Sequence, residues 1–491
     1  MSISVLALAR RVSYRRIWVR FPVLFAALLA TASVWARVEL AAHIQDQMVV
    51  QRGMPWEVSG TANDRERFIV EFRSQRIEVR PAGGAWSVRF DVPSNFTGPA
   101  ELMVDGGRLE REVLVGDIWL CSGQSNMVLS VARASDGGQM AASSQSKAVH
   151  IYQVPKPITG RPPANAGRWI ATTSPDQFRR FSAVCLAFGM ALHERTKVPV
   201  GLIDSSLGGT WIESWISSQS FDNLSLAESA RRRYAEIKKR RAATGRRRNT
   251  YGIDEPSQLF EFMVRFLARQ SIKGVLWYQG EANRRNADQY QELLSVLMKD
   301  WRAHWRNSSM PFVIMQLPGF GTPAAGFDAN SEWAAVRDAQ RRAVASSQPA
   351  GLVVSIDFGD GTIHPRTKLP FGRRAADVAV DLAYEPGNRE LVPMPTAVSF
   401  EDSTATVEFG KGRACLEATP YLSETVFVAG DDHRWHVADV SISQSSLVAR
   451  SSQVSRPVAV RYAWSDYPRV GLRTCGNGVP VTPFRTDDWR S

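Results

Sequence analysis

The sequence predicts an α/β fold of three layers, with a parallel sheet between two layers of helices and β-rich regions before and after it. In the middle of the chain, short apolar runs alternate with helical patterns, and strands that alternate with helices form parallel sheets covered on both faces. In the flanking parts, apolar residues recur at every second position and glycines break the pattern, as in antiparallel strands. A chain of 491 residues has room for two or three domains.

The first segment, residues 1–36, is predicted to be a signal peptide. It contains five arginines and no acidic residue, then an apolar run from Phe21 to Ala32, and it ends in Val34-Trp35-Ala36 with small residues at the −3 and −1 positions of a cleavage site. The apolar run is too short to span a bilayer. We therefore expect an exported protein, periplasmic or extracellular, with no stable membrane insertion after cleavage; an uncleaved anchor is the alternative.

Residues 37–110 predict an N-terminal β-sandwich-like module. Phe68, Val70 and Phe72 alternate with other residues, and Gly83-Gly84 is one of the turns that separate such runs. We find no long helical pattern in this part of the chain, so helices are not expected before residue 111.

Residues 111–385 predict the α/β domain. The expected strands are the apolar runs 113–120, 198–203, 274–278, 311–317 and 352–356. The expected helices are 176–195, 256–270, 286–305, 332–346 and 368–384. The helix 286–305 is the clearest, because its apolar residues recur at steps of three and four. Residues 386–491 return to alternating patterns and predict a C-terminal β-rich region.

The net charge of +12 is concentrated in two places. Five of the positive charges lie in the predicted signal peptide, and residues 231–248 contain ten Lys or Arg and one acid. The rest of the chain is close to neutral, so a nucleic-acid partner is not expected. We expect the basic run to be a solvated helix and loop, because Tyr234 is its only aromatic residue; binding of an acidic glycan or envelope polymer is the alternative.

The four cysteines have no metal-ligand spacing, and no metal site is expected. Cys415 and Cys475 both lie in the C-terminal region, where they could form a disulfide if the protein is exported. Cys121 and Cys185 lie in apolar strand and helix patterns, so we expect buried thiols there.

Polar and glycine-rich motifs follow four of the predicted strands, and the carboxyl ends of parallel strands are where functional residues gather. These motifs are Gly123-Gln124-Ser125-Asn126-Met127, Ser205-Ser206-Leu207-Gly208-Gly209-Thr210, Trp277-Tyr278-Gln279-Gly280-Glu281-Ala282-Asn283 and Asp357 to Pro365. The first is not a Gly-x-Ser-x-Gly elbow, because a methionine occupies its last position.

The chemistry that these motifs permit is acyl transfer without a metal or organic cofactor. Ser125 is the candidate nucleophile and His364 the candidate base; Ser122 is a rival nucleophile that lies nearer the strand. A tetrahedral oxyanion needs donors, which the backbone N–H groups of Ser125 and Gly209 and the amide of Asn283 could supply.

The motifs and their order resemble those of the SGNH hydrolases, and within them the sialate O-acetylesterase family of carbohydrate esterases. The resemblance covers nearly the whole chain after residue 36. It includes Gln47 to Arg52, Gly116-Asp117-Ile118-Trp119, Lys273 to Glu281, Ile363-His364-Pro365 and Pro480 to Thr486. It implies an SGNH-type domain with Ser125 as nucleophile and His364 as base. It further implies Gly209 and Asn283 as oxyanion donors, and Gln124, Gln279 and Glu281 as polar residues of the substrate site.

The chain departs from the family pattern just before the histidine. Many relatives carry Asp two residues before it, and SGNH enzymes generally three before, but Thr362 and Gly361 stand there. The nearest acids are Asp360, four residues before the histidine, and Asp357, seven before. Either the loop is rearranged so that Asp360 orients the imidazole, which we favour, or the enzyme works as a Ser–His dyad with a backbone carbonyl on the other ring nitrogen.

The expected function is hydrolysis of O-acetyl groups on a carbohydrate, with O-acetylated sialic acid as the first candidate, through an acetyl-serine intermediate. The alternatives are an acetylxylan or other polysaccharide deacetylase, and a carbohydrate-binding protein without catalysis, which the missing Asp suggests. The oligomeric state does not follow from the sequence.

Overall fold

The computed structural model describes residues 38–63, 67–143, 146–157, 161, 167–244, 255–323, 326–387, 393–410, 415–443 and 445–489. The predicted signal peptide and the last part of the basic run lie outside these residues. Within the described part, no helix combines the length and the apolar character needed to cross a membrane.

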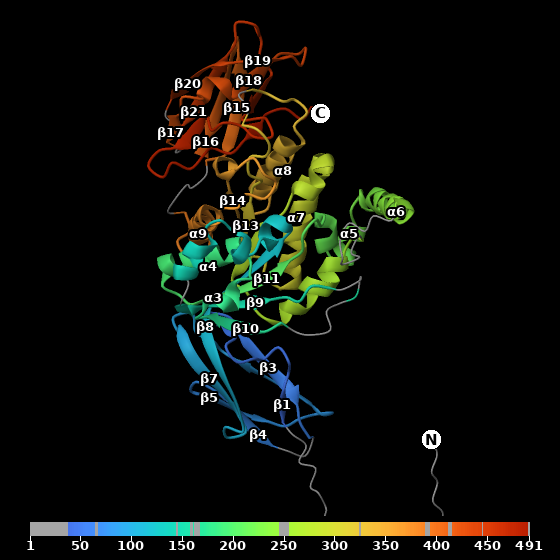
Figure 1. Ribbon diagram of the computed structural model, residues 1–491, viewed down its shortest axis with the longest axis vertical. Helices are drawn as coiled ribbons and strands as arrows, with labels where there is room; N and C mark the ends of the chain where they lie inside the picture. Colours follow the sequence, from blue (N-terminus) through green and yellow to red (C-terminus); the bar gives the residue numbers. More distant parts are fainter. Residues whose placement is uncertain are drawn as a thin grey trace, which may run out of the picture. The chain divides into compact units, whose positions relative to one another are not determined.

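The N-terminal region contains a three-stranded antiparallel sheet and a second group of antiparallel strands that continues into the central sheet (Figure 1). One contains β1 (Glu39–Leu40), β3 (Trp56–Thr61) and β6 (Ala85–Phe90), and the other contains β4 (Phe68–Phe72), β5 (Gln75–Val79), β7 (Gly98–Val104) and the first half of β8 (Leu109–Gly123). Buried aromatic rings pack between them, with Trp56 meeting Phe72 edge to face at 5.0 Å. The β-rich N-terminal region that alternation predicted is therefore present.

Strand β8 belongs both to this region and to the central sheet. Its residues 109–115 pair with β7, and Asp117 to Gly123 pair with the central strand β11 (Val200–Ser206). Side chains alternate between half-buried and exposed positions at its start and are all buried from Val113 onward. In the second half of the strand, helices cover both faces of the sheet. The predicted boundary between residues 110 and 111 falls inside this strand.

The central sheet has the order β10-β9-β11-β8-β12-β13-β14. Its other strands are β9 (Ser146–Gln153), β10 (Trp169–Thr172), β12 (Gly274–Tyr278), β13 (Phe312–Met315) and β14 (Ala350–Val353). All neighbouring strands are parallel except β10, which runs antiparallel to β9. The five predicted strands are confirmed; β9 and β10 were not predicted, because polar residues such as His150 interrupt their apolar runs.

Helices cover both faces of this sheet and make the predicted three layers. Alternate residues of β12 lie in two different cores, one on each face of the sheet. Leu276 and Tyr278 pack with residues of α4 (Ala183–Thr196) and α9 (Leu369–Ala383). Val275 and Trp277 pack with residues of α7 (Ala287–His304) and α8 (Glu332–Ser346). Helices α7 and α8 match their predicted ranges closely.

The helix predicted over residues 256–270 is wrong in type. The segment forms a π-helical turn, Phe260–Val264, followed by a 3₁₀ turn, Arg265–Arg269. The apolar spacing correctly indicated one buried face, but spacing does not determine whether hydrogen bonds close over three, four or five residues.

The C-terminal region is β-rich, as predicted. One sheet has the order β15 (Pro395–Glu401), β16 (Thr404–Phe409), β21 (Ser446–Arg450), β20 (Asp439–Ser443). A second has the order β19 (Trp435–Val437), β18 (Val426–Ala429), β22 (Ala459–Tyr462), β24 (Phe484–Arg485), and β17 (Leu416–Ala418) pairs with β23 (Leu472–Thr474). The fully buried Arg337 of α8 joins this region to the central domain, since it donates to the carbonyls of Ser465 and Asp466.

All four cysteines are paired. Cys415 is bonded to Cys475, as the sequence allowed. The expectation of free thiols at Cys121 and Cys185 is wrong: these two form a disulfide between β8 and α4, with Cα atoms 6.0 Å apart. The apolar patterns placed both residues in the core, but they did not show that α4 packs directly on β8.

Candidate active site

Parallel pairing brings the predicted motifs to one edge of the central sheet. Gly123 at the end of β8 pairs with Ser206 of β11 on one side and with Tyr278 of β12 on the other. Its φ of +136° favours glycine, and a Cβ there would lie 2.1 Å from the Tyr278 carbonyl oxygen. This close approach places the next turn, with Ser125 at the start of α1 (Ser125–Val128), beside the end of β12.

Ser125 and His364 are in direct contact. The Oγ of Ser125 lies 2.7 Å from Nε2 of His364, and the Nε2 of Gln124 lies 3.5 Å from the same Oγ. His364 is half-buried, and its pKa is lowered, first by burial and then by the positive charges of Lys368 and Arg133. A neutral imidazole beside a serine hydroxyl is the arrangement that general-base catalysis requires.

Asp360 does not contact His364. One of its oxygens accepts hydrogen bonds from the N–H and hydroxyl of Thr362, and the other accepts from the N–H of Arg366. Asp357 is paired with Arg374 at 2.7 Å and with Arg473 at 3.5 Å. In the described loop 356–369, no carboxylate forms a hydrogen bond or ion pair with the imidazole. The geometry is that of a Ser–His pair, and an orienting role for Asp360 stays a prediction.

This geometry predicts that removing the carboxylate of Asp360 has only a small effect on activity. We expect Asp360→Asn to lower kcat/KM by less than about tenfold, because the imidazole loses no partner; loss of an acid that orients a triad histidine costs about 10⁴-fold. Asp357→Asn should also leave the chemistry largely intact. Steady-state hydrolysis of an aryl acetate checks both variants, and a loss of a hundredfold or more in folded Asp360→Asn would restore the triad.

The predicted oxyanion donors lie on the two neighbouring strand ends. Gly209 has a φ of +72°, and a Cβ on the adjacent Gly208 would lie 3.6 Å from the Cβ of Ser125, so the glycine pair lies against the nucleophile. The amide oxygen of Asn283 accepts from Gln279 at 2.7 Å and from the N–H of Ile212 at 3.1 Å. Its Nδ2 donates to Glu213 at 2.8 Å, which leaves the second N–H of that amide for a ligand.

The other predicted substrate residues are engaged with the protein. Gln279 is fully buried and donates to Gln124 Oε1 at 3.1 Å, while its own Oε1 accepts from Tyr290 at 2.7 Å. Glu281 is 2% exposed and accepts from Nδ2 of Asn126 at 2.6 Å; burial raises its pKa. These contacts make Gln124, Gln279 and Glu281 part of the framework that joins the strand ends.

Several residues of the site were not predicted. Asn126 and Lys368 are fully buried beneath Ser125 and His364, and Glu213, also fully buried, accepts from Arg233 of α6 (Ala227–Thr244). Arg233 belongs to the basic run, so one member of that run supports Asn283 through Glu213 instead of facing solvent. Arg233 was expected to be solvated with the rest of the basic run, because a sequence pattern does not distinguish a buried cation from an exposed one.

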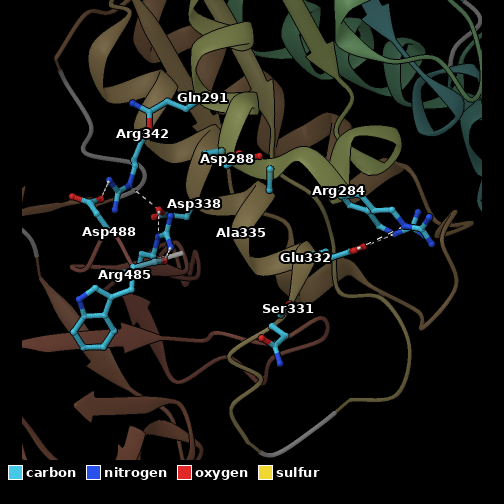
Figure 2. Close-up of a pocket in the computed structure, with 15 residues that line it drawn as sticks. Arg284, Asp288, Gln291, Ser331, Glu332, Ala335, Asp338, Arg342, Arg485 and Asp488 are labelled. Carbon is cyan, nitrogen blue, oxygen red and sulfur yellow. Dashed lines mark hydrogen bonds and ion pairs between the residues drawn. The ribbon is translucent and has the colours of Figure 1, made fainter. Parts of the chain in front are cut away.

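A polar cavity of about 660 Å³ lies elsewhere, between η5 (Glu281–Asn286), α7, α8 and the C-terminal segment (Figure 2). Ser125 and His364 are not among its lining residues. Ion pairs line this cavity: Asp338 pairs with Arg342 and Arg485, and Glu332 pairs with Arg284. The cavity therefore marks a charged junction between the central domain and the C-terminal region, apart from the Ser–His pair.

Known proteins share both this sequence and this fold. Residues 115–369 match the family described as carbohydrate esterase, sialic acid-specific acetylesterase. Human sialate O-acetylesterase is 28% identical over 459 residues, covering 83% of each chain, and the mouse protein of that name is 26% identical over 83% of this chain and 85% of its own. A solved carbohydrate acetylesterase from Xanthomonas citri is 32% identical with a TM-score of 0.78, covering 92% of this chain and 100% of that one. The chain therefore belongs to the sialic acid-specific acetylesterase family of carbohydrate esterases, and it is a carboxylic ester hydrolase.

Proposed function

We propose that the protein is an exported serine esterase that removes O-acetyl groups from carbohydrates through an acetyl-serine intermediate. The observation that carries the proposal is the 2.7 Å contact between Ser125 Oγ and His364 Nε2 at the carboxyl end of β8. Membership of the acetylesterase family supports the choice of an acetyl ester on a sugar.

The proposed reaction uses these residues in two steps. His364 takes the proton of Ser125 as Oγ attacks the acetyl carbonyl, and the backbone N–H groups of Ser125 and Gly209 and the amide of Asn283 stabilise the oxyanion. His364 then gives the proton to the departing sugar oxygen, which leaves acetyl-serine. Water, deprotonated by His364, attacks this ester; as the bond between the acetyl carbon and Oγ breaks, His364 returns the proton to Oγ, and acetate and the free serine are released.

An acidic sugar is the substrate that one feature of the site favours. Arg133 is exposed, and its charge is close enough to lower the pKa of His364. Within the described residues, its guanidinium forms no ion pair, so it is available to a carboxylate such as that of sialic acid. The relatives named sialate O-acetylesterase support the same choice, while acetylxylan and other neutral polysaccharides remain the alternative.

A substrate comparison tests this choice. We expect Arg133→Gln to raise KM for O-acetylated sialic acid about tenfold, the loss of one charge-assisted hydrogen bond, with little change on an aryl acetate. Arg179 is exposed as well but pairs with Asp176, so Arg179→Gln is the matched control. Faster turnover of acetylated xylan than of acetylated sialic acid by the unaltered protein would overturn the acidic-sugar assignment.

Export is the remaining part of the proposal. The arginine-rich start and the apolar run of residues 1–36 support it, and so do the two disulfides, since such bonds persist in oxidising compartments.

A further inference from the structure

A buried lysine lies beneath the Ser–His pair. Lys368, just before α9, is fully buried, and its Nζ donates to Oδ1 of Asn126 at 2.8 Å. The ammonium also lies 4.9 Å from the ring centre of Phe371 and 5.5 Å from that of Tyr278. No carboxylate among the described residues forms a direct ion pair with it. Burying an ammonium in this way costs free energy, so its place under an active site calls for a reason.

Asn126 connects that lysine to both halves of the site. Its Nδ2 donates to Glu281 at 2.6 Å and to the backbone carbonyl of Ile363 at 2.9 Å. Asn126 follows the nucleophile in the chain, and Ile363 precedes the histidine. One amide therefore joins the turn that carries Ser125 to the loop that carries His364, and Lys368 fixes the orientation of that amide from the other side.

We propose that Asn126 and Lys368 are positioning residues of this esterase, which hold His364 against Ser125 in a site where no acid among the described residues forms a hydrogen bond or ion pair with the imidazole. The inference rests on the proposed function, because it concerns the same serine and histidine.

Other hydrogen bonds hold the histidine loop at its ends. Asp360 accepts from the N–H groups of Thr362 and Arg366, and Asp136 accepts from the N–H of Lys368 at 2.7 Å. The hydrogen bond from Asn126 to the Ile363 carbonyl lies next to His364 and also reaches the turn that carries the nucleophile. A misplacement of about 1 Å between reacting groups can cost about 100-fold in rate, so this bond has the right position to matter for kcat.

The charges around Lys368 and His364 make the pH dependence of activity a second test of this role. Glu281, Asp360 and Asp136 face Lys368 and raise its pKa, but burial outweighs them and lowers the pKa to about 7. Lys368 and Arg133 face His364, and both lower its pKa. The histidine acts as a base only when neutral. Removing the charge of Lys368 therefore raises the pKa of His364, and activity is then lost at a higher pH as the solution is acidified.

The test measures kcat, KM and the pH dependence of kcat/KM on an aryl acetate for the full chain. We expect Asn126→Ala to lower kcat about 100-fold with little change in KM. We expect Lys368→Met to move the acidic limb of the profile to higher pH, and Lys368→Arg, which keeps the charge, to leave the limb near its original place. Lys273→Met is the control, because it removes a half-buried lysine at the opposite end of β12 and should leave the limb unchanged.

The outcomes separate this inference from the proposed function. An inactive unaltered protein contradicts the esterase proposal itself. If the unaltered protein is active, two results contradict the positioning role alone. One is a folded Asn126→Ala variant that keeps its kcat, and the other is a Lys368→Met variant whose acidic limb stays in place. If Lys368→Met does not fold, Asn126→Ala decides, because it introduces no new charge and leaves Lys368 in place.

Discussion

Ser125→Ala is expected to lower kcat for acetate release by at least about 1000-fold, since loss of a nucleophile removes the acetyl-enzyme route altogether. The Oγ of Ser125 lies within hydrogen-bond distance of His364 Nε2, and the described part of the active-site edge holds no second hydroxyl in contact with that nitrogen. The residual rate should come from binding and from the oxyanion donors. Acetate release from an aryl acetate measures it, with circular dichroism to show that the variant is folded.

The matched control is Ser122→Ala. Ser122 is fully buried three residues earlier in β8, and its hydroxyl donates to the Ser205 carbonyl at 2.6 Å. The Ser122→Ala variant should keep most of the activity. If Ser125→Ala were as active as the unaltered protein, or if neither cleaved any acetyl ester, the catalytic assignment would fail and a carbohydrate-binding role would be favoured.

Asp338→Ala is expected to lower the free energy of unfolding by about 3–5 kcal/mol, the usual cost of removing one partner from a buried ion pair. The Asp338 side chain is 1% exposed and accepts from Arg341 at 2.7 Å, Arg342 at 2.7 Å and Arg485 at 3.4 Å. The first two belong to α8 and the third to β24 of the C-terminal region. Asp338, Arg342 and Arg485 are labelled in Figure 2. Truncation leaves three cations at this junction without their shared carboxylate. Urea denaturation followed by tryptophan fluorescence measures the loss.

Glu332→Ala is the control for Asp338→Ala. Glu332 lies at the start of the same helix and pairs with Arg284 at 3.0 Å, but both side chains are 40% or more exposed. An exposed pair contributes about 1 kcal/mol or less. Equal effects of the two substitutions would show that burial does not determine the strength of this junction.

Periodicity predicted the architecture well because it reports burial. The α7 pattern and the apolar runs of the central strands match the structure, since most residues that face a core are apolar. Pairings between distant elements were harder. Cys121 and Cys185 were placed correctly in the core but not paired, because the packing of α4 on β8 depends on tertiary contacts.

The site could be predicted where topology alone determines it. Parallel strands end at one edge, so Ser125, Gly209 and Asn283 could be expected near one another before any coordinates existed. Asp360 shows the limit: its place four residues before His364 says nothing about where its carboxylate points, and nearby backbone N–H groups compete for it. Lys368 shows another limit, since lysines are rarely fully buried and composition gives no reason to expect an exception.

The continuity of β8 has a consequence for how this protein could have been assembled in evolution. Modules that are exchanged by recombination are usually joined by exposed linkers with few contacts across them. Here a single strand leaves the N-terminal sheet, enters the middle of the central sheet and ends at the nucleophile's turn. A crossover within it would shift the register of the strand and turn core side chains to the wrong face. The N-terminal region and the hydrolase core are therefore expected to be inherited as one unit.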